Sequence, residues 1–284
     1  MTENLRSDLK KFIANALAED IGNGDHTSLA CIPADAKSKA KLLVKDDGIL
    51  AGIEVALEIF KAVDPNLRID LKLQDGAKIK QGDIAFYVEG SAQSILTAER
   101  LVLNCMQRMS GIATATNQIT QLLSGLKTKV LDTRKTTPGM RLLEKWAVKI
   151  GGGENHRFGL FDMMMIKDNH VDYAGGIENA ILAAHRYLKE KNIQLKIEIE
   201  TRNLKEVQEV LRIGKVDRIM LDNFTLDNLK EAVMLIGDKY ETEASGGITK
   251  ETIRDYALCG VDFISVGALT HTVKSLDLSL KAIT

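Results

Sequence analysis

The stretch Lys196–Asn223, KIEIETRNLKEVQEVLRIGKVDRIMLDN, combines a strand-like run, a polar strand end, an amphipathic helix and a second strand. The same pattern repeats from Lys129 onward, with polar or glycine residues wherever a strand ends. The strands that it predicts are 129–131, 163–166, 196–199, 218–221, 242–244 and 263–266. Successive strand ends lie 22 to 35 residues apart, a spacing typical of parallel strands joined by helices. The pattern predicts a β/α barrel. Because it contains six units and not eight, the expected fold is α/β with an incomplete or modified barrel.

The first part of the chain has a different pattern. Residues 39–92 contain short alternating runs separated by Asp-Gly, Gln-Gly and Glu-Gly turns, which predict antiparallel strands. Between them, Val55, Ile59 and Val63 recur at helical spacing. An N-terminal α+β sandwich domain is therefore expected. Ser94–Leu123 is interpreted as a helix pair that joins the domains.

The expected domain division follows from this change of pattern. Residues 1–112 are assigned to the sandwich domain, which residues 272–284 could rejoin. Residues 113–271 are assigned to the barrel-like catalytic domain.

Composition restricts the classes of function. With 284 residues, 45% hydrophobic and 27% charged, the chain is an ordinary globular protein. Because 38 Lys and Arg are balanced by 39 Asp and Glu, a broad nucleic-acid-binding surface is not expected. No run reaches the roughly 18 apolar residues of a membrane span, and the N-terminus lacks the apolar core of a signal peptide. A cytoplasmic location without membrane partners is expected.

Cysteine and histidine spacing argues against two further classes. Cys31, Cys105 and Cys259 are far apart and odd in number, so neither a disulfide framework nor a zinc site is indicated. All three are expected to be small buried residues. No HExxH pair is present, and any metal is expected to be a hard cation held by oxygen.

Positive charge gathers in Val130–His170, which contains nine Lys, Arg and His residues around a triple glycine. Arg134-Lys135 and His156-Arg157 are adjacent pairs, and Lys167 follows the apolar run MMMI. A single lysine is most often a solvated surface charge. The clustering of these cations beside glycines instead favours a pocket for a strongly anionic small molecule.

The carboxyl ends of barrel strands converge on one face, where barrel enzymes bind their substrates. The residues at the predicted strand ends are Arg134, Lys135, Lys167, Glu200, Asp222, Ser245, Gly246 and Gly267. Glu200 and Asp222 could act as general acid and base, but carboxylates beside phosphate-binding groups more often hold Mg²⁺ or ribose hydroxyls. Ser245-Gly246-Gly247 and Ser265-Val266-Gly267 are similar to the phosphate-binding loops after the last strands of barrels.

Several motifs together resemble one family. They are EDIGNGDHTS, ERLVLNCMQRMSGIATAT, DTRKTTPGMRLLEKWAV, GGGENHR, MIKDNH, LDN, EASGGI and SVGALTH. With them the chain resembles the quinolinate phosphoribosyltransferases, also called nicotinate-nucleotide pyrophosphorylases (carboxylating), over nearly its whole length. Departures occur at Trp146, Cys105-Met106 and Thr272, and none changes a charged site residue.

The resemblance implies a reaction and its substrates. Quinolinate and 5-phosphoribosyl-1-pyrophosphate would give nicotinate mononucleotide, pyrophosphate and carbon dioxide, for NAD synthesis. It also implies a homodimer in which Arg100 reaches the site from the partner subunit. Whether such dimers associate further stays open.

The resemblance also implies roles for individual residues. Arg134, His156 and Arg157 would hold the two carboxylates of quinolinate. Lys135 and Lys167 would neutralise phosphate and the carboxylate that is lost, in an order that stays open. Glu200 and Asp222 would oppose positive charge on ribose, directly or through Mg²⁺ that accompanies the pyrophosphate substrate. The full expected substrate-binding set is Arg100, Thr133, Arg134, Lys135, His156, Arg157, Lys167, Glu200, Asp222, Ser245, Gly246, Gly247, Val266, Gly267 and Ala268; the expected catalytic residues are Lys135, Lys167, Glu200 and Asp222.

Three other functions remain as alternatives. A barrel lyase or aldolase could form a Schiff base on Lys167. The hairpins DDGILAG and DGAKIKQGD are similar to those of lipoyl and biotinyl carriers, but neither contains a lysine flanked by methionines. A related transferase with another acceptor is the nearest alternative, and the expected acid clamp favours a diacid acceptor.

Overall fold

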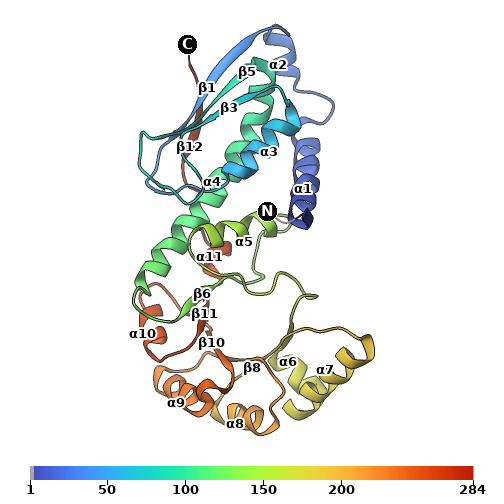
Figure 1. Ribbon diagram of the computed structural model, residues 1–284, viewed down its shortest axis with the longest axis vertical. Helices are drawn as coiled ribbons and strands as arrows, with labels where there is room; N and C mark the ends of the chain where they lie inside the picture. The colour runs from blue at the N-terminus through green and yellow to red at the C-terminus, as the bar shows by residue number, and fades with distance from the viewer. Residues whose placement is uncertain (1–2, 284) are drawn as a thin grey trace. The chain divides into compact units, whose positions relative to one another are not determined.

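The computed structural model describes residues 3–283 and divides into two compact units (Figure 1). The first unit contains Met1–Asn117, Thr136–Gly152 and Leu269–Thr284. The second contains Gln118–Lys135 and Gly153–Ala268. Compactness alone does not define which parts fold as domains, so the domain boundary between 112 and 113 stays a prediction.

The first unit is built on antiparallel sheets, as its alternating sequence predicts. The larger sheet has the strand order β12 (Leu278–Ala282), β1 (Lys37–Val44), β5 (Ile84–Ser91), β3 (Arg68–Leu71), and β2 (Gly48–Ile49) pairs with β4 (Lys78–Ile79). The unit also contains helices α1 (Glu3–Ile21), α2 (His26–Cys31), α3 (Ile53–Val63) and α5 (Arg141–Ile150), most of α4 (Ala92–Leu122) and most of the short α11 (Ala268–His271). Phe60 of α3 meets Phe86 of β5 edge to face with ring centroids 5.8 Å apart, so this helix covers one face of the sheet. The expected α+β sandwich is confirmed.

The expected helix pair over Ser94–Leu123 is wrong, because one continuous helix, α4, spans Ala92–Leu122. The Ser110-Gly111 step does not interrupt it. A side chain at Gly111 would come within 2.3 Å of the Lys274 carbonyl, so glycine is required there by close packing. The cost of one helical glycine, about 1 kcal/mol, is smaller than the packing that it permits.

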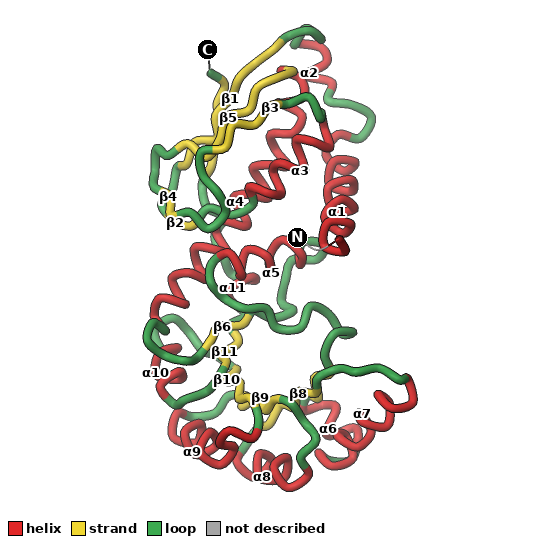
Figure 2. Tube along the Cα trace, viewed as in Figure 1, coloured by secondary structure: helices red, strands yellow, loops and turns green. Residues whose placement is uncertain are grey.

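The second unit is a six-stranded parallel sheet (Figure 2). Its strand order is β6 (Lys129–Leu131), β11 (Phe263–Ser265), β10 (Glu241–Ser245), β9 (Arg218–Asp222), β8 (Ile197–Thr201), β7 (Met164–Ile166). These match all six predicted strands within two residues at each end. The helices are α6 (Asp168–Ala174), α7 (Ile177–Lys191), α8 (Leu204–Ile213), α9 (Leu226–Ile236), the 3₁₀ turn η1 (Gly237–Lys239) and α10 (Ile253–Leu258). Figure 1 shows α8, α9 and α10 along the outer side of the curved sheet.

The barrel is incomplete because β6 and β7 do not pair with each other. Between these strands the chain leaves the second unit at Thr136 and returns at Gly153. On return it makes a single parallel bridge, with Glu154 N–H donating to Val130 O at 2.8 Å and Asp132 N–H donating to Glu154 O at 3.1 Å. The expected incomplete barrel is confirmed, and the segment after Gly153 lies beside β6, where a barrel strand is missing.

Two further observations concern the whole chain. Among residues 3–283, no helix is both long enough and apolar enough to cross a membrane.

Cys105 and Cys259 are buried as expected, but Cys31 is exposed, so that expectation is wrong for one of the three cysteines. Cys31 ends the short surface helix α2, and nothing in the sequence distinguishes this position from a buried one.

Candidate active site at the carboxyl ends of the barrel strands

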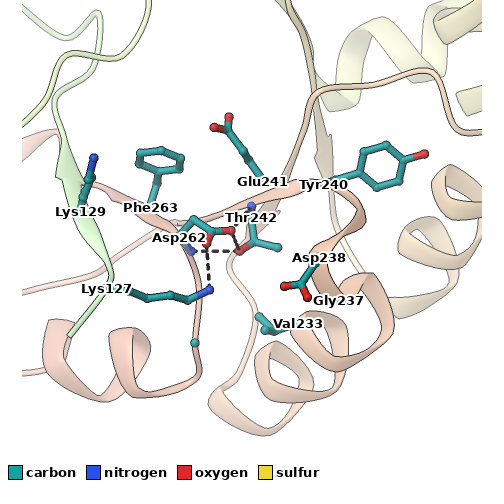
Figure 3. A pocket seen from close by; sticks show the side chains of 11 residues that line it. Lys127, Lys129, Val233, Gly237, Asp238, Tyr240, Glu241, Thr242, Asp262 and Phe263 are labelled. Atoms are coloured by element: carbon teal, nitrogen blue, oxygen red, sulfur yellow. Dashed lines mark hydrogen bonds and ion pairs between the residues drawn. The ribbon is translucent and has the colours of Figure 1, made fainter.

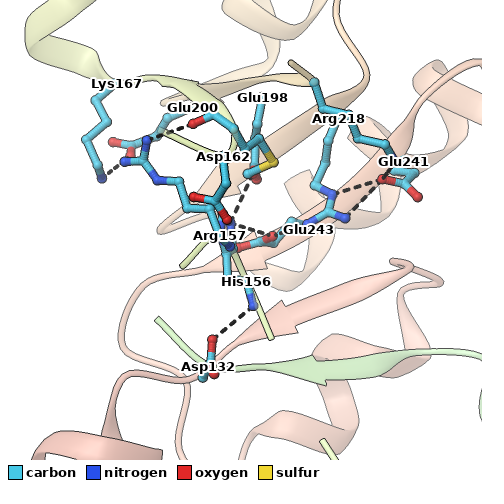
Figure 4. Close-up of polar contacts among 12 residues, drawn as sticks. Asp132, His156, Arg157, Asp162, Lys167, Glu198, Glu200, Arg218, Glu241 and Glu243 are labelled. Carbon is cyan, nitrogen blue, oxygen red and sulfur yellow. Dashed lines mark hydrogen bonds and ion pairs between the residues drawn. The ribbon is translucent and has the colours of Figure 1, made fainter. Parts of the chain in front are cut away.

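The second unit places polar side chains at the carboxyl ends of neighbouring strands (Figure 4). Glu200 lies near the end of β8, Asp222 ends β9 and Ser245 ends β10. Ser245 is directly opposite Asp222 in the β9–β10 register. Lys167 follows β7 as the first residue before α6. The predicted strand-end residues therefore occupy one edge of the sheet, as a parallel arrangement requires.

Lys167 and Glu200 form an ion pair across the ends of β7 and β8. The Nζ atom of Lys167 is 3.0 Å from Oε2 of Glu200. The Lys167 side chain is 46% exposed, whereas that of Glu200 is 10% exposed. Lys167 lies between Ile166, which is buried at the end of β7, and the first residue of α6. The backbone position of Lys167 is therefore held on both sides. The pair provides a cation that can meet an incoming anion and a carboxylate held in place beside it.

The ends of β9 and β10 are held together by a close backbone contact. Asn223 has a φ of 57°, its N–H donates to Ser245 O at 2.9 Å, and its Nδ2 donates to Asp222 Oδ2 at 2.6 Å. Gly246 has a φ of 94°, and a Cβ there would be 2.9 Å from the Asn223 backbone N. Only glycine satisfies both the positive φ and the short approach. This contact fixes the orientation of the Asp222 carboxylate.

Arg157 is half-buried and faces another cation. Burial lowers its pKa, and the positive charge of Arg134 lowers it further. The Nη1 atom of Arg157 donates to Met163 O at 3.1 Å, and Asp162 accepts the N–H groups of Phe158 and Gly159 at 2.6 and 2.8 Å, which braces the following turn. Two arginines that raise each other's electrostatic energy form a site that is stabilised when an anion binds between them.

His156 is buried and points into the barrel. Its backbone N–H donates to Asp132 Oδ1 at 2.9 Å, and its Nδ1 accepts from Arg157 N–H at 2.7 Å. Its Nε2 lies 3.0 Å from Glu198 Oε2 and 3.4 Å from Glu243 Oε2. These contacts are ion-pair contacts by distance, and they direct the ring toward the strands. The three residues predicted to hold the quinolinate carboxylates therefore differ in their surroundings. His156 contacts the carboxylates of Glu198 and Glu243, whereas Arg157 lies near the charge of Arg134.

A buried charge cluster lies inside the sheet and was not predicted from the sequence. We name it the interior cluster: His156, Glu198, Arg218 and Glu243. Nη1 of Arg218 is 3.1 Å from Glu243 Oε2, and the guanidinium lies 4.0 Å from the centre of the Phe263 ring. The side chains of Glu198 and Glu243 are both fully buried. The alternation in KIEIE, with a charge at every second position of a buried strand, is the sequence signal that could have revealed it.

The interior cluster shifts the pKa values of its members. Burial lowers the pKa of His156, but contacts with Glu198 and Glu243 outweigh burial and raise it. Burial and the charge of Glu243 raise the pKa of Glu198 to about 7. Burial acts in the same direction on Glu243, but His156, Ser265 and Arg218 hold the pKa of Glu243 below its usual range. The cluster thus holds protons that an unfolded chain would release near neutral pH.

Metal-ligand geometry occurs once within residues 3–283. Ligand atoms of His156, Glu198 and Glu243 lie within 4.8 Å of one another. Arg218 already supplies positive charge to this group, which disfavours an added cation. Glu200 and Asp222 lie on neighbouring strands with their carboxylates at the strand ends, which fits the preference of Mg²⁺ for one or two carboxylates plus phosphate oxygens.

The remaining predicted residues are placed as follows. Arg100 is exposed on α4 in the first unit. Thr133 accepts from Lys135 N–H at 3.1 Å through its hydroxyl, which shapes the loop after β6. Gly247 follows Gly246 with a φ of 61°, and Val266, Gly267 and Ala268 follow β11. Except for Arg100, the predicted site residues belong to the second unit.

A separate pocket of about 440 Å³ opens at the amino ends of β6, β10 and β11 (Figure 3). It is lined by Lys127, Lys129, Val233, Gly237, Asp238, Tyr240, Glu241, Thr242, Gly260, Asp262 and Phe263. Lys127 and Asp262 pair at 2.9 Å, and Asp262 also accepts from Thr242 N–H and its hydroxyl at 2.9 and 2.8 Å. These contacts join strand starts, so the pocket is a structural feature of the opposite end of the strands.

A parallel β/α barrel with cations, carboxylates and a glycine turn at its strand ends defines the class of barrel enzymes that act on small anionic substrates. Two family models match the chain: the quinolinate phosphoribosyl transferase N-terminal domain over residues 25–110, and its C-terminal domain over 112–281. The chain belongs to the quinolinate phosphoribosyl transferase family. The resemblance read from the motifs is confirmed.

Relatives and solved structures agree. The chain is 51% identical to the nicotinate-nucleotide pyrophosphorylase [carboxylating], chloroplastic, of Arabidopsis thaliana, covering 96% of this chain and 82% of that protein. It is 42% identical to the probable nicotinate-nucleotide pyrophosphorylase [carboxylating] of Bacillus subtilis, covering 96% and 92%. The crystal structure of NadC from Streptococcus pyogenes matches with a TM-score of 0.91, 37% identity and 97% of both chains covered.

Proposed function

We propose that the enzyme joins quinolinate to 5-phosphoribosyl-1-pyrophosphate and releases pyrophosphate and carbon dioxide, leaving nicotinate mononucleotide for NAD synthesis. The observation that carries the proposal is the group of cations beside the strand ends: Lys167, which follows β7, and Arg157, whose pKa burial lowers and the charge of Arg134 lowers further. Such a group favours an anionic ligand, and the planar guanidinium matches a carboxylate in two places. The family and its relatives support the choice of quinolinate.

The acceptor side of the site is assigned to Arg134, Arg157 and Lys167. Quinolinate carries two adjacent carboxylates on a pyridine ring, so two arginines and a lysine can neutralise both. His156 supports this group through its bond with Arg157 N–H. Arg100 of the partner subunit would add a further cation in a homodimer, which accords with its exposed position on α4.

The phosphoribosyl side is assigned to the strand ends of β8 to β11. Ser245, Gly246, Gly247, Val266, Gly267 and Ala268 would offer backbone N–H groups to the 5-phosphate, and Thr133 and Lys135 would contact phosphate oxygens. Glu200 and Asp222 would hold Mg²⁺ together with substrate phosphates, or the ribose hydroxyls directly. When bound, Mg²⁺ supplies positive charge that stabilises the departing pyrophosphate.

The reaction balances without a covalent enzyme intermediate. The quinolinate nitrogen forms a bond to ribose C1 as the bond from C1 to the pyrophosphate oxygen breaks. The carboxylate next to the ring nitrogen then leaves as carbon dioxide, and the ring carbon takes a proton. Glu200 and Asp222 place negative charge where C1 becomes positive, while Lys135 and Lys167 neutralise phosphate and carboxylate. The ion pair of Lys167 with Glu200 suits charge neutralisation, in contrast to the free amine that a Schiff-base lyase needs.

The proposal is tested by supplying phosphoribosyl pyrophosphate and Mg²⁺ with either quinolinate or nicotinate. Mass spectrometry follows nicotinate mononucleotide, and trapped carbon dioxide is measured in parallel. Product and carbon dioxide from quinolinate, with little product from nicotinate, are expected. Arg157→Ala should remove most of the activity, whereas the control Arg212→Ala, at an exposed helix ion pair, should retain it. Product from nicotinate alone would overturn the proposal in favour of another acceptor.

The dimer and its location are tested separately. A mixture of inactive Arg100→Ala and inactive Lys167→Ala subunits should regain activity, because one mixed site would be intact if Arg100 acts across the interface. No recovery in proven mixed dimers would contradict the shared site. We propose a cytoplasmic location, which fractionation with a cytoplasmic marker enzyme checks; recovery with membranes or in an organelle would contradict it.

A further inference from the structure

The segment that carries His156 and Arg157 has no strand ladder to hold it. It lies beside β6 at the incomplete part of the sheet and makes the single bridge between Leu131 and Glu154. The neighbouring strands β8, β9 and β10 pair with one another over four or five residues, whereas this segment pairs with β6 at one residue. Its geometry must therefore depend on side-chain contacts.

One anchor of this segment is Asp132, which is fully buried. Its Oδ1 accepts from the His156 backbone N–H at 2.9 Å, and its Oδ2 accepts from Asn155 Nδ2 at 2.5 Å. Asp132 thereby fixes the backbone at residues 155 and 156. It does not fix the orientation of the His156 ring.

The second anchor is the interior cluster, which fixes the ring. Nε2 of His156 lies 3.0 Å from Glu198 and 3.4 Å from Glu243. With Nε2 held there, Nδ1 of the neutral ring, which carries its proton on Nε2, faces the Arg157 N–H and accepts from it at 2.7 Å. If the ring turned away from the carboxylates, that hydrogen bond would be lost. The position of Arg157 is thus linked to the carboxylates by one ring.

Arg218 keeps the two carboxylates in place. It pairs with Glu243 at 3.1 Å, stacks on Phe263, and is held from the other side by Glu241 at 3.0 Å. Apolar residues of the same volume would fill this interior with less desolvation cost. A buried charge network that destabilises the fold can still be useful if it holds nearby residues in one conformation. The residues that this network holds are those of the segment 155–157.

We propose that Glu243, held by Arg218, is a positioning residue that orients His156 and through it places Arg157 for binding the quinolinate carboxylates. This inference rests on the proposed function of Arg157. Glu243 itself lies within β10 and its side chain is fully buried. Its effect is therefore expected on acceptor binding and not on the phosphoribosyl half of the site.

The test measures KM for both substrates in Glu243→Gln and in the matched control Glu241→Gln. Glu241 lies two residues earlier on the same strand and pairs with the same Arg218. Its side chain is 39% exposed, whereas the side chain of Glu243 is fully buried. Glu243→Gln should raise KM for quinolinate about tenfold, because small displacements of binding groups have large effects. KM for phosphoribosyl pyrophosphate should change less than twofold, as should both values in Glu241→Gln.

A double variant shows whether the effect passes through Arg157. If Glu243 acts by placing Arg157, then Glu243→Gln should add little to the loss already caused by Arg157→Ala. Full additivity of the two losses would overturn the proposal. So would an unchanged KM for quinolinate in Glu243→Gln, or equal increases in both KM values, which would indicate a general structural role.

Two provisions keep the outcome decisive. If Glu243→Gln does not fold, Glu243→Asp keeps the buried charge but withdraws the carboxylate from both His156 and Arg218 by one methylene, and the same selective rise in KM is expected. An unchanged KM in that variant would also overturn the proposal. If the wild-type enzyme does not use quinolinate, the proposed function fails; if it does and Glu243 variants bind it normally, only this inference fails.

Discussion

Replacement of Arg218 by methionine tests the interior cluster through stability. Methionine keeps most of the side-chain length and its contact with Phe263, but it removes the only cation that pairs with Glu243 among the arginines and lysines of residues 3–283. Two fully buried carboxylates, Glu198 and Glu243, then face each other without that charge. Breaking a buried pair in this way costs about 3 to 5 kcal/mol. The contact with Glu241 adds little, since its side chain is 39% exposed.

The expected loss also depends on pH. Burial and Glu243 already raise the pKa of Glu198 to about 7, above its unfolded value of 4.5. A group whose pKa is raised on folding favours the folded state at low pH, and this contribution is lost as the pH rises through the folded value. Protonation relieves the repulsion that Arg218→Met exposes, so the loss should be smaller at pH 5.5 than at pH 8.

Urea unfolding followed by circular dichroism measures both effects, with hydrogen exchange of the β9 and β10 amides to report on the second unit. The double variant Arg218→Met with Glu243→Gln should recover part of the loss, because it removes one of the two buried negative charges that face each other. A loss below about 1 kcal/mol at pH 8, or the same loss at both pH values, would refute the assignment of a buried charge cluster.

Three further predictions concern other parts of the molecule. Arg108 donates to Glu144, whose side chain is fully buried, and to Val273 O at 3.0 Å, so Arg108→Met should lower the free energy of unfolding by about 3 kcal/mol; a loss below about 1 kcal/mol would contradict a buried pair. Gly246→Ala should cost about 1 to 3 kcal/mol and reduce kcat, because the new Cβ meets the Asn223 backbone; Gly237→Ala, which also has a positive φ but has open space, is the control, and equal effects would contradict the close-contact argument. Glu198 and Glu243 raise the pKa of His156, so its contribution to stability should be present below pH 6.5 and lost as the pH rises above the folded pKa; urea unfolding of wild type and His156→Gln should converge as the pH rises, and parallel curves would contradict the shift.

Much of the barrel could be predicted because its signal is local. Each predicted strand is a short apolar run followed at once by a polar or glycine end, and parallel pairing then brings these ends to one edge. The rule alone predicted the positions of Lys167, Glu200 and Asp222 at the strand ends. The pairing of Lys167 with Glu200 could not be, because it depends on the β7–β8 register and on side-chain rotamers.

What the sequence did not reveal depends on contacts between distant segments. The close approach of Lys274 explains why a glycine stands at position 111 inside the continuous helix α4. The sequence does not show this contact, and the helix was predicted as a pair. The interior cluster joins His156, Arg218 and Glu243 from separate parts of the chain, and a charge in a strand is ordinarily taken for a solvent-facing residue. The structure shows that the side chains of Glu198 on β8 and Glu243 on β10 are fully buried.

If Arg157 recognises the second carboxylate of a diacid, the affinities of the free enzyme for a diacid and a monoacid should differ. Calorimetric titration of quinolinate and nicotinate into wild type and Arg157→Ala compares acceptors that differ by one carboxylate. Wild type should bind quinolinate at least tenfold more tightly than nicotinate, since a bond between charged partners contributes about 1.5 to 3 kcal/mol. Arg157→Ala should remove that preference. Retention of the preference in the variant, or no preference in wild type, would contradict the account.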